Sequence, residues 1–101
     1  MQEFQEKVFQ AIKKIPKGKI TTYSAIARFL GKPDAARAVG NACNANPFAP
    51  RVPCHRVVKS SGGIWGYAFG VKRKIALLKK EGIAVKRGII VGFEKKLFSF
   101  K

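Results

Sequence analysis

The most reactive side chains in this sequence stand together in the stretch Pro53-Cys54-His55-Arg56-Val57-Val58. It holds one of the two cysteines and the only histidine of the chain. A cysteine is a useful nucleophile as the thiolate, which a neighbouring imidazole and nearby cations favour. His55 is adjacent, and three cations flank the pair: Arg51, Arg56 and Lys59. The motif predicts a nucleophilic Cys54, and the alternative is a small buried side chain that only packs.

Backbone stiffness is expected to hold Cys54 in place. Pro53 fixes its own φ and pushes Val52 toward extended geometry. The apolar pair Val57-Val58 indicates a strand from Arg56 to Lys59. Cys54 is therefore expected on a turn that leads into a strand.

A carboxylate that orients His55 would complete the pairing of nucleophile and base. Glu81 is the expected partner because it ends a helix, just before Gly82, where the helix dipole disfavours an acid. The alternative is a solvated acid that offsets the surrounding lysines.

Composition limits the classes of function. With 101 residues the chain is expected to form one domain, residues 1–101. Lys and Arg number 21 against 5 acids, a net charge of +16, which favours a polyanionic partner, with nucleic acid ahead of a membrane surface. Neither a membrane span nor a signal peptide is apparent. Two cysteines without paired spacing indicate a reducing, cytoplasmic setting. Two cysteines and one histidine are too few ligands for a metal site, so no metal or cofactor is expected.

Apolar spacing predicts three helices in the first half of the chain. Residues 4–15 repeat at helical intervals up to a Pro-Lys-Gly stop. A threonine can cap a helix over 23–31, and Asp34 can cap another over 35–43. Two short helices around a glycine-containing turn are the outline of a helix-turn-helix.

The second of these two helices carries almost no side-chain bulk. A helix that reads the major groove needs several long polar side chains, whereas small residues permit close approach to the minor groove. Arg37 is its one long cation and could replace a displaced base. The alternative is a helix that packs tightly against a neighbour. The small residues are Ala35, Ala36, Ala38, Gly40 and Ala42.

Later segments give weaker signals. Asn46 before Pro47 indicates a turn. The aromatic loop 64–70 could close over a planar ligand with Tyr67 as a donor, or form a small hydrophobic cluster. Residues 83–93 are expected to be extended or a small hairpin, and the basic, aromatic tail 94–101 has no assigned role. A helix from about Val71 is expected to bury a stripe at 71, 75 and 78 and to expose these cations: Lys72, Arg73, Lys74, Lys79 and Lys80.

Taken together, these motifs resemble the C-terminal domain of O6-alkylguanine-DNA alkyltransferase. The resemblance runs in order from about Phe4 to Ile90, without an insertion between Tyr23 and Gly82. It implies a mainly α-helical fold with short strands, a winged-helix-like helix-turn-helix domain without the family's usual N-terminal domain. The residues that carry it are Tyr23, residues 35–40, Asn46-Pro47, residues 53–57, Tyr67, and Leu77-Leu78 through Gly82.

The resemblance implies direct repair of double-stranded DNA that contains O6-alkylguanine, with O4-alkylthymine as a further lesion. The domain would bind the minor groove, flip the base out and move its alkyl group to Cys54 once per molecule. His55 would act through a water to take the proton of Cys54, and Glu81 would orient His55. Tyr67 would donate to the guanine ring, and the backbone around Val57 would accept from its exocyclic amine.

The resemblance also implies a set of DNA contacts. Tyr23 would crowd a phosphate, although it could equally be an ordinary surface tyrosine. Arg37 would fill the space of the flipped base, with Ala35, Ala36 and Ala38 allowing close approach. Asn46 would be the hinge to the active-site turn, and Ser60 would contact the DNA backbone. A monomer without cofactor, in the cytoplasm of a prokaryote and bound to its nucleoid, would fit this function.

Two pocket positions depart from the family pattern. Ala68 replaces a usual Ser, whose contact to guanine comes from the backbone, and Phe69 replaces a usual Gly, which predicts a narrower pocket that disfavours bulky adducts. The chain also has the length of alkyltransferase-like proteins, which bind alkylguanine but lack the acceptor cysteine. A lesion sensor that recruits excision repair is therefore the first alternative. A helix-turn-helix regulator with a redox cysteine, and a cysteine hydrolase, are more distant.

Overall fold

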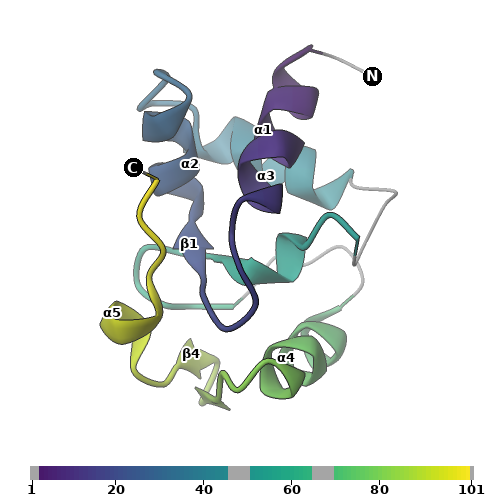
Figure 1. Ribbon diagram of the computed structural model, residues 1–101, viewed down its shortest axis with the longest axis vertical. Coiled ribbons are helices and arrows are strands. Elements are labelled where there is room, and N and C mark those ends of the chain that lie inside the picture. Colours follow the sequence, from purple (N-terminus) through teal and green to yellow (C-terminus); the bar gives the residue numbers. More distant parts are fainter. Residues whose placement is uncertain (1–2, 46–50, 65–69, 101) are drawn as a thin grey trace.

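The computed structural model describes residues 3–45, 51–64 and 70–100. They form a mostly helical domain with short strands, as the sequence predicted (Figure 1). Among these residues no helix is long and apolar enough to cross a membrane. The elements in order are α1 (Glu3–Lys13), β1 (Thr21–Thr22), α2 (Tyr23–Phe29), α3 (Ala36–Asn44), the 3-10 helix η1 (Cys54–Arg56), β2 (Val57–Val58), α4 (Val71–Lys80), β3 (Val85–Lys86), β4 (Ile89–Ile90) and α5 (Phe93–Lys96).

Helices α1, α2 and α3 pack together around the larger of two hydrophobic cores. Apolar positions of α1 recur at helical spacing and are buried there, with Val8 and Ile12 fully covered. Ile26 of α2 and Val39 of α3 enter the same core. Cys54 and Val57 also belong to it, so the turn that carries the reactive motif is built directly onto the three helices.

The start of α2 is capped as the sequence predicted, whereas the start of α3 is not. Thr22 has extended φ and ψ of −114° and 159°, and its Oγ1 accepts the backbone N–H of Ala25 at 3.0 Å. The prediction that Asp34 caps the next helix is wrong. The carbonyl of Ala35 accepts the first helical bond, from Val39, so Ala35 is the cap residue and Asp34 lies outside the helix.

A short parallel ladder joins the beginning of α2 to the reactive turn. Thr21 pairs with Val57 and Thr22 with Val58. The strand is shorter than the predicted residues 56–59, because position 56 belongs to η1 and Lys59 closes a turn with Gly62 and Gly63. The ladder thus fixes the N-cap of α2 in position relative to the strand that follows Cys54.

The C-terminal half forms a second, smaller core under α4. Ile20, Ile64, Leu78 and Ile90 meet there. Strands β3 and β4 form an antiparallel hairpin, the second of the two forms expected for residues 83–93. Its two central residues, 87 and 88, both have positive φ, 53° and 76°, as the twist of a two-residue hairpin demands.

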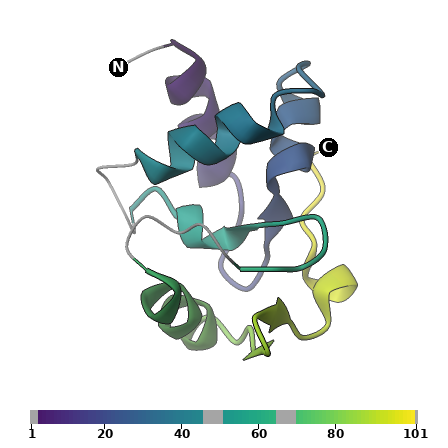
Figure 2. The same ribbon diagram turned by 180° about the vertical axis from the view of Figure 1, so that it is seen from behind.

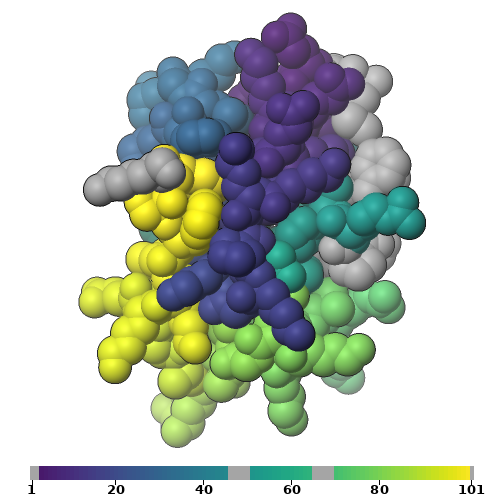
Figure 3. Space-filling model, in the orientation of Figure 1, coloured from purple at the N-terminus to yellow at the C-terminus, as the bar shows by residue number. Residues whose placement is uncertain are grey.

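The tail crosses back to the N-terminal half. Leu97 forms a parallel bridge with Ile20, whose N–H donates to the carbonyl of Lys96 at 2.9 Å and whose carbonyl accepts the N–H of Phe98 at 2.7 Å. Phe100 then stacks on Phe29 of α2, with ring centroids 4.6 Å apart. In the space-filling view the tail lies beside the segment that follows α1 (Figure 3), whereas α3 lies on the opposite side of the molecule (Figure 2).

Candidate active site

Cys54 and His55 lie at the start of η1, on a turn ahead of a strand as predicted. Within this turn Cys54 N–H donates to the carbonyl of Val52 at 2.8 Å, and Arg56 N–H donates to that of Pro53 at 2.9 Å. The side chains of Cys54 and His55 are each only 2% exposed. The tight backbone therefore places a thiol and an imidazole inside the domain rather than on its surface.

Glu81 is the hydrogen-bond partner of His55, as the sequence predicted. It lies at the C-cap of α4, and its Oε2 is 3.1 Å from Nε2 of His55. If Nε2 carries the proton and donates it to this carboxylate, then Nδ1 of the neutral ring is left as an acceptor. Nδ1 is buried and has no partner among the described residues. The hydrogen bond to Glu81 therefore leaves Nδ1 of His55 as a buried nitrogen that can accept a proton.

Arg56 was predicted only as a cation beside Cys54, and its pairing with Glu81 was not predicted. Its Nε and Nη2 donate to the two oxygens of Glu81 at 2.9 and 2.6 Å, and its Nη1 donates to the carbonyl of Ile15 at 2.7 Å. A guanidinium that grips both carboxylate oxygens fixes their orientation. The sequence did indicate such a pairing, because Arg56 follows His55 directly and the chain has only five acids that could pair with it.

The protonation states follow from burial and these contacts. Burial lowers the pKa of His55, assisted by Arg56 and Lys74 and opposed by Glu81. Burial alone would raise the pKa of Glu81, but the hydrogen bonds from Arg56 and His55 outweigh it and lower that pKa. At neutral pH the site thus holds an ionised Glu81 and a neutral imidazole, the form that can accept a proton.

Lys74 is buried, so its predicted place on the exposed cationic face of α4 is wrong. Its side chain has no exposed surface, and Nζ donates to the carbonyl of Val57 at 2.7 Å. Position 74 is three residues after Val71 and four before Leu78, and helical spacing puts all three on one face. Helical spacing alone therefore indicated that Lys74 lies on the buried face of α4. Burial lowers the pKa of this ammonium to about 8, although Cys43 and Cys54 partly oppose the shift.

The buried ammonium of Lys74 makes stability depend on pH. Its pKa is 10.5 in the unfolded chain and about 8 in the folded one, so the unfolded chain holds more protons between these values and the free energy of unfolding rises with pH there. The raised pKa values of Cys43 and Tyr23 act in the opposite direction above about pH 9. From pH 8 to 9 we expect a rise of about 1 kcal/mol, since one pKa unit corresponds to about 1.4 kcal/mol.

Urea unfolding at pH 8 and pH 9 measures this rise directly. The control is Lys74→Met, which keeps the length of the side chain and removes the titrating group. We expect the variant to lose the rise. A wild-type protein whose stability does not change across the window, or a variant that gains as much as the wild type, would contradict the assignment.

Helix α3 lies on the surface and presents the predicted DNA-contact residues. Arg37 and Ala38 are exposed, and Ala35 and Ala36 are half-buried. Tyr23 is half-buried at the start of α2, and burial raises its pKa. A Cβ at Gly40 would lie 3.9 Å from the ring of Tyr23, so these residues of the two helices are close neighbours.

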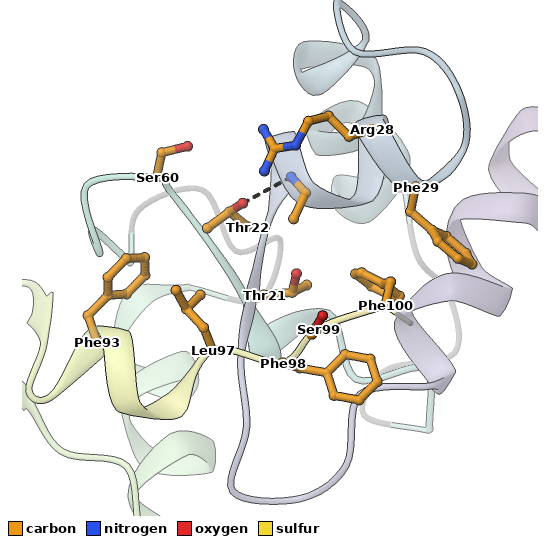
Figure 4. A pocket seen from close by; sticks show the side chains of 11 residues that line it. Thr21, Thr22, Arg28, Phe29, Ser60, Phe93, Leu97, Phe98, Ser99 and Phe100 are labelled. Atoms are coloured by element: carbon orange, nitrogen blue, oxygen red, sulfur yellow. Dashed lines mark hydrogen bonds between the residues drawn. The ribbon is translucent and has the colours of Figure 1, made fainter.

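The other predicted residues fall into two groups. Ser60 is exposed and its hydroxyl lies 3.4 Å from that of Ser24 in α2, while Val57 is buried beside Lys74. Ser60 also lines a hollow of about 700 Å³ between α2 and the tail, near Arg28 (Figure 4). Of the predicted site residues that the structure describes, only Ser60 lines this hollow. Four predicted residues lie outside the described part of the chain: Asn46, Tyr67, Ala68 and Phe69.

Two short helices joined by a tight turn, on a chain of net charge +16, define the class as a small helical DNA-binding domain. Comparison with protein families makes the assignment specific. Residues 3–83 match the family described as 6-O-methylguanine DNA methyltransferase, DNA binding domain. The chain belongs to this family of DNA repair proteins.

Individual relatives fall into two kinds. A methylated-DNA–protein-cysteine methyltransferase of Methanosarcina acetivorans is 52% identical over 80 residues, which are 79% of this chain and 51% of that protein. The Mycobacterium tuberculosis OGT, solved in complex with DNA, is 48% identical with a TM-score of 0.78, over 80% of this chain and 50% of that one. The chain thus spans about half the length of these methyltransferases.

Schizosaccharomyces pombe Atl1 is similar over nearly its whole length. Its structure in complex with damaged DNA that contains O6-carboxymethylguanine matches with a TM-score of 0.87 and 34% identity. The match covers 98% of this chain and 97% of that one. The similarity to Atl1 therefore extends into the tail that packs against Ile20.

Proposed function

We propose that this protein repairs double-stranded DNA by transferring the alkyl group of O6-alkylguanine to Cys54, once per molecule. The observation that carries the proposal is the chain of contacts at the reactive turn. A buried thiol is followed directly by an imidazole, and that imidazole is hydrogen-bonded to an ionised carboxylate. The named methyltransferase relatives support the same class of reaction.

Each group has a role in the proposed reaction. Nδ1 of His55 takes the thiol proton of Cys54 through a water, while Glu81 holds the ring and stabilises its cationic form. The thiolate then attacks the alkyl carbon, so that a sulfur–carbon bond forms as the carbon–oxygen bond breaks. The electron pair of the broken bond stays on guanine, and Tyr67 donates a proton or hydrogen bond to it. A thioether has no easy route back to a thiol, which makes the reaction stoichiometric.

The proposed DNA contacts use the exposed side of α3. Small residues at Ala35, Ala36 and Ala38 let the helix approach the minor groove, and Arg37 enters the stack in place of the flipped base. Tyr23 and Ser60 contact the phosphate backbone on either side. Asn46 joins α3 to the reactive turn, and the pocket positions Val57, Ala68 and Phe69 contact the base. One domain thus carries both DNA binding and transfer.

Intact mass analysis tests the transfer. The protein is mixed with a duplex that contains one O6-methylguanine, and peptide mapping then locates any added mass. We expect one methyl group per molecule, on Cys54, and none on the Cys54→Ser variant. Cys43→Ser is the matched control, because it also replaces a buried cysteine but keeps the acceptor. A methyl group on any other residue would overturn the proposal.

A second function is favoured by the match to Atl1 over almost the entire chain. In that function the protein senses alkylguanine without repairing it, and excision repair follows. The same mixture separates the two functions. Tight binding to the lesion-containing duplex without a mass change would assign the sensor function, because the thiol would then be chemically silent.

A further inference from the structure

The exposed side of α4 carries four cations that the candidate active site does not use. Counted from the first of them, the others follow after one, seven and eight residues, which helical geometry puts on one face. Ala76 lies at the centre of this face and is exposed as well. Lys74, the fifth cation of the helix, is buried on the other side. The four cations, which are called the α4 surface below, are Lys72, Arg73, Lys79 and Lys80, and all are exposed.

The positive charge of the α4 surface is not compensated within the part of the chain that the structure describes. No ion pair among the described residues includes any of the four cations. The acid that follows them in the sequence is Glu81, and its two carboxylate oxygens are held by Arg56 and His55. Four neighbouring cations without acids repel one another, and a polyanion that binds them would remove this repulsion.

Two of the four cations lie where they oppose the stability of the helix. Lys72 and Arg73 are in the first turn of α4, and that turn has no acid. The helix dipole favours acids at this end, as in α1, whose first turn holds Glu3 and Glu6. Folding alone therefore does not explain cations at the start of α4. An anionic partner explains them, because it reverses the sign of the local interaction.

Helix α4 lies on the same side of the molecule as α3. Figure 2 shows both helices on the side that faces the viewer, with η1 between them, and α4 packs on η1. A helix that lies in a groove crosses the axis of the duplex, so a duplex held by α3 extends beyond both long sides of this helix. One of these sides is the side of α4.

We propose that the α4 surface is a second DNA-contact surface, which binds backbone phosphates of the duplex that α3 holds. The inference rests on the proposed function, which supplies duplex DNA as the polyanion. From Lys72 to Lys80 the helix rises about 12 Å, and phosphates of one strand follow one another about every 3.4 Å along the duplex axis. The surface can therefore neutralise about three or four phosphates. The small side chain of Ala76 leaves its centre open to the backbone of the DNA.

The test is the salt dependence of DNA binding, measured by fluorescence anisotropy. The duplex has about 20 base pairs, or about 68 Å, and is longer than the 34 Å of the domain. A variant with glutamine at all four positions of the α4 surface should lower the slope of log affinity against log salt concentration by about 2 to 4 units, since each phosphate contact contributes about 0.9. Two such contacts correspond to a loss of about 30-fold in affinity between 1 M and 0.15 M salt.

A matched variant separates local contacts from net charge. It replaces four exposed lysines near the other side of the molecule by glutamine, so that both variants lower the net charge of +16 by four. Its slope should change by less than about 1 unit. Lysine, arginine and glutamine have similar helix propensities, and urea unfolding should show that both variants are folded. The four lysines are Lys13, Lys14, Lys17 and Lys95.

Three results would overturn the proposal. The first is an α4-surface variant whose slope equals that of the wild type, and the second is an equal loss of slope in the two variants. The third is unchanged DNA binding together with lost binding to vesicles that contain phosphatidylserine, which would make the partner a membrane surface. Phosphate contacts carry no sequence information, so the preference for a duplex with O6-methylguanine over an undamaged duplex should be the same in the α4-surface variant and the wild type.

Failure of this inference is distinguishable from failure of the proposed function. The slopes are measured with the undamaged duplex, so they need no methyl transfer. If Cys54 is methylated and the slopes coincide, then only the role of the α4 surface is wrong. If the slopes differ as expected but no methyl group is transferred, then the proposed function is wrong and the second DNA contact stands.

Discussion

Replacing Glu81 by alanine is expected to lower the free energy of unfolding by about 2 to 3 kcal/mol and to slow methyl transfer to Cys54 about 100-fold. The stability loss arises because Arg56, whose side chain is only 16% exposed, would keep its charge without the carboxylate that accepts its two hydrogen bonds. The rate loss arises because His55 would lose the partner that orients its ring. Urea unfolding and single-turnover transfer measure the two effects.

Glu94→Ala is the matched control for this variant. Glu94 is an exposed acid on α5, and its loss changes the net charge equally, so stability should change by less than about 0.5 kcal/mol. Because the pKa of Glu81 is lowered by folding, its stabilisation is present above pH 4.5 and is lost on further acidification. A Glu81→Ala protein with wild-type stability and rate would show that the carboxylate is dispensable.

Replacing Arg37 by alanine is expected to reduce methyl transfer from duplex DNA about 50- to 100-fold. Arg37 is exposed on α3 and is proposed to occupy the space of the flipped base, whose unstacking costs a few kcal/mol. If Arg37 offsets about 2.5 kcal/mol of this unstacking cost, then removing it slows transfer by this factor. The measurement is the single-turnover rate with an O6-methylguanine duplex at fixed salt concentration.

Arg28→Ala tests whether charge alone explains the effect. Arg28 is an exposed cation of α2, and its removal should weaken DNA binding only a few-fold. Alkylation of Cys54 by iodoacetamide should be unchanged in both variants, because neither residue is expected to act on the thiol. If Arg28→Ala and Arg37→Ala slow transfer equally, then Arg37 acts only as a counter-charge to phosphate.

The local parts of the fold and of the site could be predicted from the sequence. Some features depend only on the backbone preferences of neighbouring residues, which the sequence shows directly. They are the α2 cap at Thr22, the turn at Cys54 and the hairpin between Val85 and Ile90. The pairing of His55 with Glu81 could also be predicted. An acid at the C-terminal end of a helix opposes the helix dipole, and such a position implies a partner elsewhere.

What could not be predicted depends on contacts between distant segments. A buried Lys74 contradicts the general preference of lysine for solvent, and only its spacing to Leu78 indicated otherwise. Cys43 and Cys54 lie in the same core because α3 and η1 both pack into it, which no local pattern contains. Asp34 has the chemistry of a cap but lies one residue too early, because element boundaries are set by the turn before the helix.

The bridge between Ile20 and Leu97 has a consequence for the order in which the chain folds. The contact joins segments near opposite ends of the sequence, and such contacts form late because a long loop must close first. Until the tail arrives, the N–H and carbonyl of Ile20 are without their partners, Lys96 and Phe98. Cys54, His55 and Glu81 all precede the tail. In refolding, the candidate site can therefore assemble before the tail docks, and docking of the tail then supplies the partners of Ile20.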